Sequence, residues 1–453
     1  MQFYSKPIPE NEEVPLADDG QWEELVETWT ERDAPTEQSD AVYVVSIGTE
    51  RDPRVRQAQL EEILSLVEAQ GGDVVGYEML TLTKVRPRTL IGKGTSRAIA
   101  DRARELGAQM MVLDAELSPS QMRNLEDDAG IKVCDREAVI LNVFLKHAST
   151  RRAKIQIEIA QLEYLRPRIR GVGIDMDQQM GGVAGSRGPG ETASELLARG
   201  LDNRLVELRK AHARLKRAGE NSRSRRERCQ CVALVGYTNA GKTSLMNALT
   251  GESLSSRDRP FETLDTVSRS LSRHGEDVLL SDTVGFIRRL PERLLASFET
   301  TLAEVREASL LALVVDISDY EWSQHLQITT ELLERLGAGD APRFFIFNKI
   351  DLLPQRPARV FFEKIANDSP FAVVSSLDEA SVAQLREALL KVVREEQEER
   401  TLFVPYSETV TLNLIYGGCR VIETESLEGG LRLTFQGPPG VVGRIESSLE
   451  ART

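Results

Sequence analysis

Cysteine and long apolar runs are both scarce in this chain of 453 residues, and each scarcity excludes a class of protein. The four cysteines stand at positions 134, 229, 231 and 419 without a Cys-x-x-Cys pair, so neither a disulfide framework nor a zinc site is indicated. No apolar run reaches the roughly 20 residues that span a bilayer. The acidic first twenty residues contain no apolar signal core. We therefore expect a cytoplasmic protein with no membrane partner.

Positive charge is also in deficit, because the formal net charge is −14, but the charges are unevenly distributed. Residues 1–40 hold twelve acidic and two basic residues, a net charge of −10, which predicts an acidic flexible extension. The rest of the chain therefore carries only −4. Residues 204–228 hold ten basic residues against three glutamates. This basic stretch is either a solvated helix face or a surface that contacts phosphates.

Strand-like and helix-like segments alternate in the first third of the chain, which predicts a small parallel sheet with helices. Gly130 is placed to end the last of these helices. The expected strands are residues 41–47, 73–82, 109–114 and 131–135, and the expected helices are residues 55–69, 95–106 and 118–130.

A helical hairpin is expected next. Residues 137–164 are largely helical in pattern, and a second helix is expected from Thr192, which has capping-box spacing to Glu195. Its apolar residues recur at coiled-coil spacing and face a matching set on the first helix. The stretch 171–190 between the two helices holds seven glycines, and residues 220–228 are expected to form a linker. The seam consists of Leu201, Leu205, Leu208, His212 and Leu215, opposite Ile155, Ile159 and Leu162.

A phosphate-binding loop is predicted where the sequence reads GYTNAGKTS, between an apolar strand and a helix. The glycines let backbone N–H groups surround phosphates, Lys242 neutralises charge on the β- and γ-phosphates, and the Thr243 hydroxyl can bind Mg²⁺. The expected nucleotide-binding residues of the loop are Gly236, Tyr237, Thr238, Asn239, Ala240, Gly241, Lys242, Thr243 and Ser244.

The stretch DTVGF supplies the second phosphate motif. Asp282 can hold Mg²⁺ through water, and the amide of Gly285 can bond the γ-phosphate. Phe286 occupies the position where many GTPases have a glutamine that orients the attacking water, so another group must do so. Asn239 either coordinates a monovalent cation, K⁺, beside the phosphates or only stabilises its loop.

Specificity for guanine is predicted from FNKID, which follows a central apolar strand. The carboxylate of Asp351 can accept hydrogen bonds from guanine N1 and the 2-amino group, which adenine cannot donate. Asn348 can secure neighbouring loops and Lys349 can lie over the base. A backbone N–H at Ser375 or Ser376 can meet guanine O6.

These motifs place the chain in a recognisable class. GYTNAGKTSLMNALTG, FETLD, DTVGFIRRLP, FNKIDLL, LSPSQMRNLE and SRGPGETASE together resemble the HflX family of GTPases, over about residues 41–400. The switch reads FETLDTVSR where the family usually has FATLDPTTR, which indicates a divergent member or paralogue. Thr263 in this switch is the expected sensor of Mg²⁺ and the γ-phosphate. Lys242, Thr263 and Gly285 are the expected catalytic residues, with GTP as substrate and GDP as product.

The resemblance implies a fold as well as an activity. It implies an α/β protein in which a P-loop GTPase domain, with a mostly parallel sheet and helices on both faces, follows a smaller α/β domain with a long antiparallel helical hairpin and precedes a small α+β domain. The expected parts are the extension (1–40), the N-terminal α/β domain (41–136), the hairpin with a glycine-rich tip and a basic shaft (137–228), the GTPase domain (229–398) and the C-terminal domain (399–453).

The resemblance also implies a partner, the ribosome and chiefly its large subunit. The implied action is splitting or rescue of stalled ribosomes under stress by a monomer, with the tip loop near the peptidyl-transferase region. Two alternatives stay open: a ribosome-binding regulator with little hydrolysis, and a cation-dependent GTPase that acts on another RNA. The expected rRNA contacts are Arg166, Arg168, Arg170 and Arg187 near the tip, and Arg209, Lys210, Arg214, Lys216 and Arg217 on the shaft.

Overall fold

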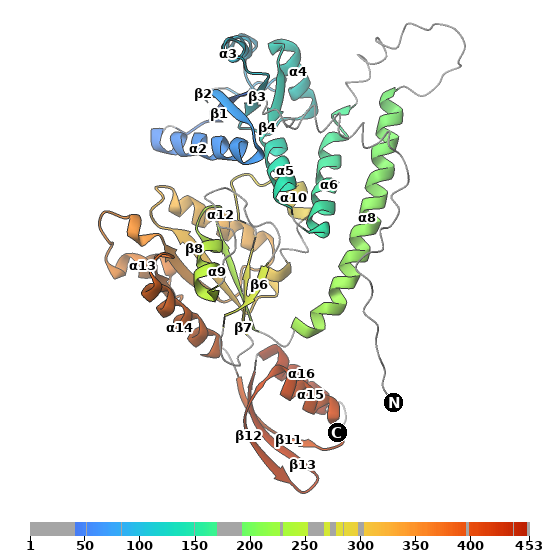
Figure 1. Ribbon diagram of the computed structural model, residues 1–453, viewed down its shortest axis with the longest axis vertical. Helices are drawn as coiled ribbons and strands as arrows, with labels where there is room; N and C mark the ends of the chain where they lie inside the picture. Colours follow the sequence, from blue (N-terminus) through green and yellow to red (C-terminus); the bar gives the residue numbers. More distant parts are fainter. Residues whose placement is uncertain are drawn as a thin grey trace, which may run out of the picture.

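Three sheets succeed one another along the length of this computed structural model (Figure 1). The acidic extension, the glycine-rich tip and Thr263 lie outside the described part of the chain. The structure describes residues 41–50, 52–82, 84–148, 150–169, 193–226, 230–251, 267–271, 278–283, 285–297, 303–395, 398–437 and 439–450.

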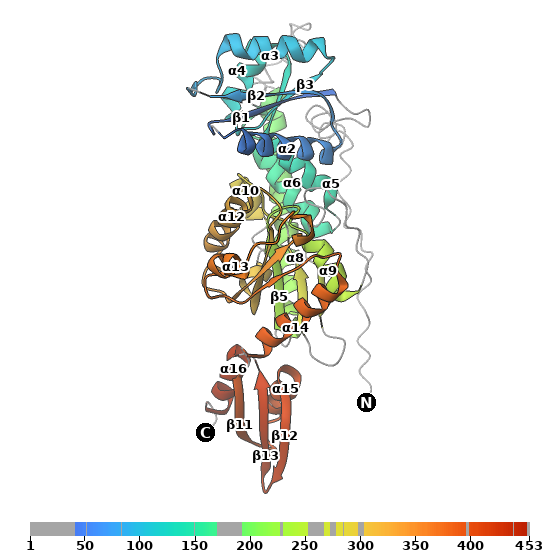
Figure 2. The same cartoon turned by 90° about the vertical axis from the view of Figure 1, so that its left-hand side faces the viewer.

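The N-terminal sheet is fully parallel, as predicted, with strand order β2-β1-β3-β4. Strands β1, β3 and β4 bury nearly all of their side chains, which is why they read as apolar runs, whereas the edge strand β2 is only partly buried. Helices α2 and α5 cover one face, and α3 and α4 cover the other (Figure 2). The elements are β1 (Ala41–Gly48), α2 (Pro53–Gln70), β2 (Asp73–Thr81), α3 (Lys93–Glu105), β3 (Met110–Leu113), α4 (Pro119–Ala129), β4 (Lys132–Asp135) and α5 (Arg136–His147).

The hairpin pairs α6 (Arg151–Leu165) with α8 (Ala193–Arg226) through the predicted leucine and isoleucine seam. Of two expectations here, the first was confirmed with a break in the helix, and the second was wrong. The helical stretch 137–164 is two helices, because the chain turns at Ala148 and Thr150 caps α6 by accepting a hydrogen bond from the Ala153 N–H, 3.1 Å away. The expected linker at 220–228 is helical as far as Arg226, since residues 220–226 contain neither glycine nor proline to end the helix.

The third unit has the predicted mostly parallel sheet, in the order β10-β9-β8-β5-β7-β6, with β6 antiparallel to β7. Helices α9 and α14 cover one face, and α10 to α13 cover the other. The elements are β5 (Gln230–Gly236), α9 (Lys242–Thr250), β6 (Val267–Ser270), β7 (Val278–Asp282), α10 (Glu292–Ser297), α11 (Ala303–Arg306), β8 (Leu310–Asp316), α12 (Trp322–Arg335), β9 (Arg343–Asn348), the short 3-10 helix η3 (Ile350–Leu352), α13 (Arg359–Ala366), β10 (Phe371–Val373) and α14 (Glu379–Glu395).

The C-terminal unit is a small antiparallel sheet in the order β11-β13-β12, with two helices packed on one face. This is the expected α+β arrangement. Among the described helices of the whole chain, none is both long and apolar enough to cross a bilayer. The elements are β11 (Glu398–Pro405), α15 (Thr409–Gly418), β12 (Arg420–Leu427), β13 (Gly430–Gly437) and α16 (Pro439–Glu450).

Candidate nucleotide-binding site

The predicted phosphate loop lies at the carboxyl end of the central strand β5 and leads directly into α9. Two of its glycines are required by the space around them. A Cβ on Gly236 would lie 2.3 Å from the Val314 carbonyl oxygen, and one on Gly241 would lie 2.3 Å from Asn348 Nδ2. Gly241 also has φ of +89°, which disfavours other residues. The loop therefore keeps its backbone close to its neighbours, and it leads into the amino end of α9, where an anion is stabilised.

Lys242 has a buried ammonium group whose positive charge is only partly balanced by the groups around it. Its Nζ donates to the carbonyl oxygens of Gly236 and Tyr237, at 3.1 and 2.8 Å. Burial lowers the pKa of Lys242 to about 8, against a smaller upward effect from the charge of Asp282. A phosphate group in the loop would restore the missing negative charge.

Two oxygen ligands meet beside this ammonium. The Thr243 hydroxyl lies 2.8 Å from Oδ2 of Asp282, whose side chain is fully buried at the end of β7. Carboxylate and hydroxyl oxygens suit Mg²⁺, which binds to few protein groups and completes its shell with phosphate and water. The described residues hold no group of three or more His, Cys, Asp or Glu side chains placed to bind a metal. The pair therefore fits a cation shared with phosphates.

The segment after Asp282 closes against the phosphate loop. The Thr238 N–H donates to the Phe286 carbonyl at 2.7 Å, and the Phe286 N–H donates to the Gly236 carbonyl at 3.1 Å. A Cβ on Gly285 would lie 2.9 Å from Thr238 Cγ2 and 3.1 Å from Lys242 Nζ. Phe286 is 1% exposed and packs in the core, so its side chain lies away from any attacking water.

The predicted base-binding residues come together at the ends of β9 and β10. Asn348 Nδ2 donates to the Ala240 carbonyl at 2.9 Å, as the sequence suggested for a residue that secures loops. Lys349 Nζ pairs with Asp316 at 2.8 Å. The Ile350 N–H donates to the Val374 carbonyl at 3.3 Å, which joins the loop of Asp351 to the loop of Ser375 and Ser376.

Asp351 and Ser376 are left available at this edge of the sheet. The Asp351 side chain is exposed and forms no hydrogen bond or ion pair within the described chain, and neither does the Ser376 N–H. Ser375 is buried and its hydroxyl accepts from the Leu377 N–H at 3.3 Å, so Ser375 shapes the loop.

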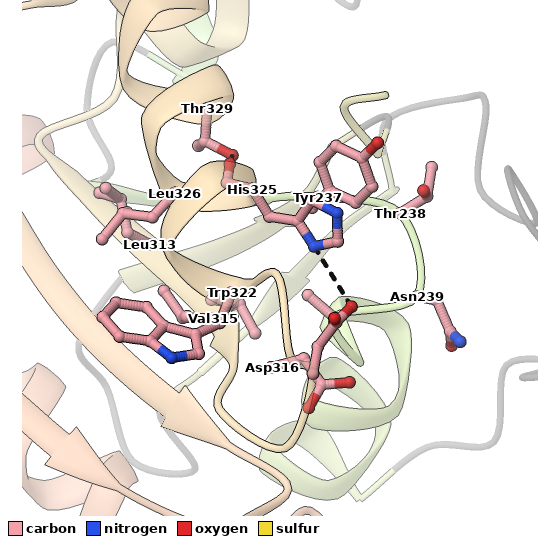
Figure 3. A pocket seen from close by; sticks show the side chains of 13 residues that line it. Tyr237, Thr238, Asn239, Leu313, Val315, Asp316, Trp322, His325, Leu326 and Thr329 are labelled. Atoms are coloured by element: carbon pink, nitrogen blue, oxygen red, sulfur yellow. Dashed lines mark hydrogen bonds and ion pairs between the residues drawn. The ribbon is translucent and has the colours of Figure 1, made fainter. Parts of the chain in front are cut away.

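Behind the phosphate loop lies a cavity of about 40 Å³ (Figure 3). This volume accommodates water but not a nucleotide. Tyr237 of the loop stacks on His325 of α12, with ring centroids 3.7 Å apart, and His325 lies 3.3 Å from Asp319. The cavity therefore separates the loop from α12 rather than holding a substrate.

An interdomain polar network, which the sequence did not reveal, holds Tyr237 from the other side. The Tyr237 hydroxyl donates to Glu62 of α2 and accepts from the Arg288 N–H at 3.0 Å. Burial, and then the charge of Glu62, raises the pKa of Tyr237. Arg136 of α5 pairs with Glu62, bonds Asp114 at 2.6 Å and donates to the Arg288 carbonyl at 3.1 Å. The N-terminal domain thus touches both the phosphate loop and the segment after Gly285.

Most described arginines expected to contact rRNA near the tip and shaft are engaged internally. Arg168 lies over the Tyr164 ring, 3.5 Å from its centroid, and donates to Asp135 and to the Leu117 carbonyl. Arg168 is therefore engaged inside the protein, and its contact with RNA stays a prediction. Arg166 pairs with Asp202, and Arg209 pairs with Glu163 at 2.7 Å.

The remaining expected RNA contacts divide into two groups. On the shaft, Lys210, Arg214 and Arg217 are exposed. Arg170 and Arg187, together with the Lys216 side chain, lie outside the described part of the chain.

The chain matches three families along its length. Residues 57–145 match "GTP-binding GTPase N-terminal", residues 147–226 match "GTP-binding GTPase Middle Region", and residues 231–349 match "50S ribosome-binding GTPase".

Two relatives that are more than 30% identical to this chain carry the same name. A "GTPase HflX" of Gluconacetobacter diazotrophicus is 40% identical over 348 residues, which are 76% of this chain and 75% of that protein. A "GTPase HflX" of Lacrimispora saccharolytica is 34% identical over 413 residues, covering 90% of this chain and 96% of that protein. The solved complex of SsGBP with GDP is 24% identical, with 78% of this chain and 99% of that chain covered and a TM-score of 0.47.

Proposed function

Because this chain belongs to the HflX family of GTPases, we propose that it binds the ribosome, chiefly through the large subunit, and couples its nucleotide state to the splitting or rescue of stalled ribosomes under stress. The chain is a GTPase, which converts GTP to GDP and phosphate. Cytoplasmic action as a monomer is part of the proposal.

The phosphate roles follow from the positions of three side chains. Lys242 binds the β- and γ-phosphates, because its buried ammonium lacks a full counter-charge. Thr243 and Asp282 hold Mg²⁺, with Thr263 added from the switch. When bound, Mg²⁺ neutralises charge on the phosphate oxygens. The N–H of Gly285, which lies against Lys242, bonds the γ-phosphate.

The base roles follow from the two groups left available at the edge of the sheet. Asp351 accepts from guanine N1–H and the 2-amino group, and the Ser376 N–H donates to guanine O6. Asn348 ties this base loop to the phosphate loop through its bond to Ala240. Lys349 lies along the base while its Nζ is held by Asp316.

A group other than the buried Phe286 side chain must orient the attacking water. We infer slow hydrolysis by the isolated protein, of the order of 10⁻⁴ to 10⁻² s⁻¹, as for GTPases with an incomplete catalytic set. Ribosomal subunits complete the site. Asn239 would hold a K⁺ ion, which would supply positive charge for the phosphates.

One observation carries the proposal: an under-compensated buried lysine stands beside a threonine–aspartate pair in a domain that matches "50S ribosome-binding GTPase". The test is sedimentation with purified large or small subunits in GDP, GTP or a non-hydrolysable analogue, with single-turnover hydrolysis measured in parallel. We expect analogue-dependent pelleting with large subunits and faster hydrolysis in their presence. Equal pelleting in all nucleotide states, with no stimulation, would overturn the ribosomal role.

A further inference from the structure

The basic loop, defined as residues 84–90, follows β2 in the N-terminal domain. Between Glu78 and Asp101 the sequence holds five basic residues and no acidic one, in a chain whose net charge is −14. Three of these cations, Lys84, Arg86 and Arg88, stand in the basic loop, and all three are exposed.

The backbone of the basic loop is closed on itself. The Arg86 N–H donates to the Leu90 carbonyl at 2.9 Å, and the Leu90 N–H donates back to the Arg86 carbonyl at 2.8 Å. The buried Thr89 hydroxyl donates to the Ile91 carbonyl at 2.7 Å. These bonds fix a tight turn with Pro87 and Arg88 at its outer end.

Two amide side chains of α4 fix this turn by donating hydrogen bonds to its carbonyl groups. Gln121 Nε2 donates to the Pro87 carbonyl and Asn124 Nδ2 donates to the Arg88 carbonyl, each at 3.1 Å. Gln121 is itself fixed by the capping box with Ser118. The sequence LSPSQMRNLE, noted only for its resemblance to a family, therefore builds the platform of the basic loop.

The cations of the basic loop lack acidic partners, unlike the hairpin arginines. Lys84 and Arg86 form no ion pair with any residue that the structure describes. The charge of Arg88 acts on Asp128, but the pKa of that carboxyl is lowered first by its hydrogen bond to Lys93, 2.7 Å away, and less by Arg88. A rigid turn that gathers like charges without neutralising them is suited to an anionic ligand.

The basic loop lies at the same end of the N-terminal sheet as the outer end of the hairpin. Arg168, just beyond α6, donates to the Leu117 carbonyl at 2.8 Å, and Leu117 directly precedes the cap of α4. We propose that the basic loop binds the phosphate backbone of structured RNA, on the side of the N-terminal domain where α6 ends. The proposal rests on the ribosomal function proposed above and names a contact for it.

The composition of the basic loop favours RNA over other anionic partners. Protein interfaces centre on aromatic anchors, whereas only Val85 and Pro87 are exposed here among apolar residues. Membrane attachment by basic residues needs an amphipathic helix or a longer basic cluster, and the basic loop is a short turn. Phosphate contacts from arginine and lysine on a fixed backbone position a protein on RNA without reading its sequence.

The test removes the charges and, separately, the platform. The variant Lys84→Gln/Arg86→Gln/Arg88→Gln should bind purified large subunits and a 30-base-pair RNA duplex at least about tenfold more weakly at moderate salt, with a salt slope shallower by about 2 to 3 units. Gln121→Ala/Asn124→Ala keeps every charge, so it should bind more weakly with an unchanged salt slope. Thermal unfolding midpoints verify that both variants are folded.

A matched control removes three exposed cations elsewhere. Arg359→Gln/Arg400→Gln/Arg432→Gln makes the same change in net charge at residues that pair with nearby glutamates, and it should bind like the unchanged protein. A photo-crosslinker at position 86 then identifies the partner. Crosslinks to RNA support the proposal.

Three outcomes would overturn it: equal loss in the control, crosslinks to ribosomal protein alone, or binding to phosphatidylglycerol vesicles without binding to the duplex. If the unchanged chain binds the duplex but not the subunits, the ribosomal function fails while the basic-loop proposal stands. If it binds the subunits and the basic-loop variant binds them equally well, only the basic-loop proposal fails.

Discussion

Lys242 is unusual among the side chains of the site because burial disfavours its ordinary positive charge. Burial lowers its pKa from 10.5 to about 8. The unfolded chain therefore binds more protons between these two pH values, so the free energy of unfolding rises with pH across that window. Below pH 8 both states are protonated and the destabilising effect is fully present.

We predict that Lys242→Met stabilises the nucleotide-free protein at pH 7 by about 1 kcal/mol or more, because it removes a buried charge at similar volume. The gain should shrink as the pH rises from 8 to 10.5. Chemical denaturation of nucleotide-free protein at pH 7 and pH 9.5 measures both effects. A less stable variant at pH 7 would show that the two carbonyl bonds compensate the charge fully.

Asp351 is expected to decide which base is bound. Asp351→Asn replaces an acceptor by a donor, so GTP affinity should fall by orders of magnitude and xanthine nucleotides should be preferred. Titration calorimetry with GDP and xanthosine diphosphate measures the change. Because Asp351 is exposed and unpaired in the described chain, the unfolding midpoint should not move. Unchanged GDP affinity would refute the assignment.

Asn239 allows two interpretations that one substitution separates. The φ of Asn239 is +61°, a left-handed conformation that asparagine tolerates. One interpretation is therefore that Asn239 only fixes the shape of the loop. Asn239→Gly keeps that shape and removes the side-chain carbonyl. We predict that hydrolysis by the unchanged protein is faster in K⁺ than in Na⁺ and that the variant loses this difference while still binding GDP. Equal rates in both salts for the unchanged protein would leave Asn239 a structural role only.

At the scale of elements, α2 is joined to the phosphate loop by one hydroxyl. Tyr237→Phe removes the hydrogen bond to Glu62 and the one accepted from the Arg288 N–H, so a partly buried carboxylate and a buried N–H each lose a partner. We predict a loss of about 1–3 kcal/mol in the free energy of unfolding.

A double-mutant cycle with Glu62→Gln gives the coupling between the two residues. Tyr320→Phe is the control, because its hydroxyl makes only an exposed 3.4 Å contact to Asp52. If the effects of the two substitutions on the free energy of unfolding are additive, the contact between the two side chains contributes nothing to stability.

Elements and sites whose signals are local could be predicted from the sequence. The phosphate loop and the cluster at Asn348 each form within one strand and the turn after it, so residue type and spacing were sufficient. The hydrogen bond from Tyr237 to Glu62 joins residues 175 positions apart, and no periodic pattern in the sequence predicts it. Arg168 resembled an RNA contact because its partner Asp135, 33 positions away, comes beside it only in the folded chain.

The whole molecule combines a nucleotide site with the segment that joins α6 to α8, and the functions of the two should be separable. Replacing residues 173–187, which lie outside the described chain, by a short linker should leave GTP binding intact. Pelleting with ribosomes should weaken only moderately, since this segment carries few charges and the basic surfaces lie elsewhere. Subunit dissociation should disappear. The two assays are run in parallel on the same protein, and dissociation at the full rate would reduce the tip to a connection between helices.

Helix α8 has a mechanical consequence at this scale. Its 34 residues form one uninterrupted rod that ends at Arg226, and the strand that leads into the phosphate loop begins at Gln230 (Figure 1). At about 1.5 Å per residue the rod is roughly 50 Å long. It therefore acts as a lever: a rotation of about 5° at its nucleotide end would displace its outer end by about 4 Å, a geometric estimate from that length. Adjustments too small to repack the nucleotide site would thus displace the start of α8 by atomic dimensions.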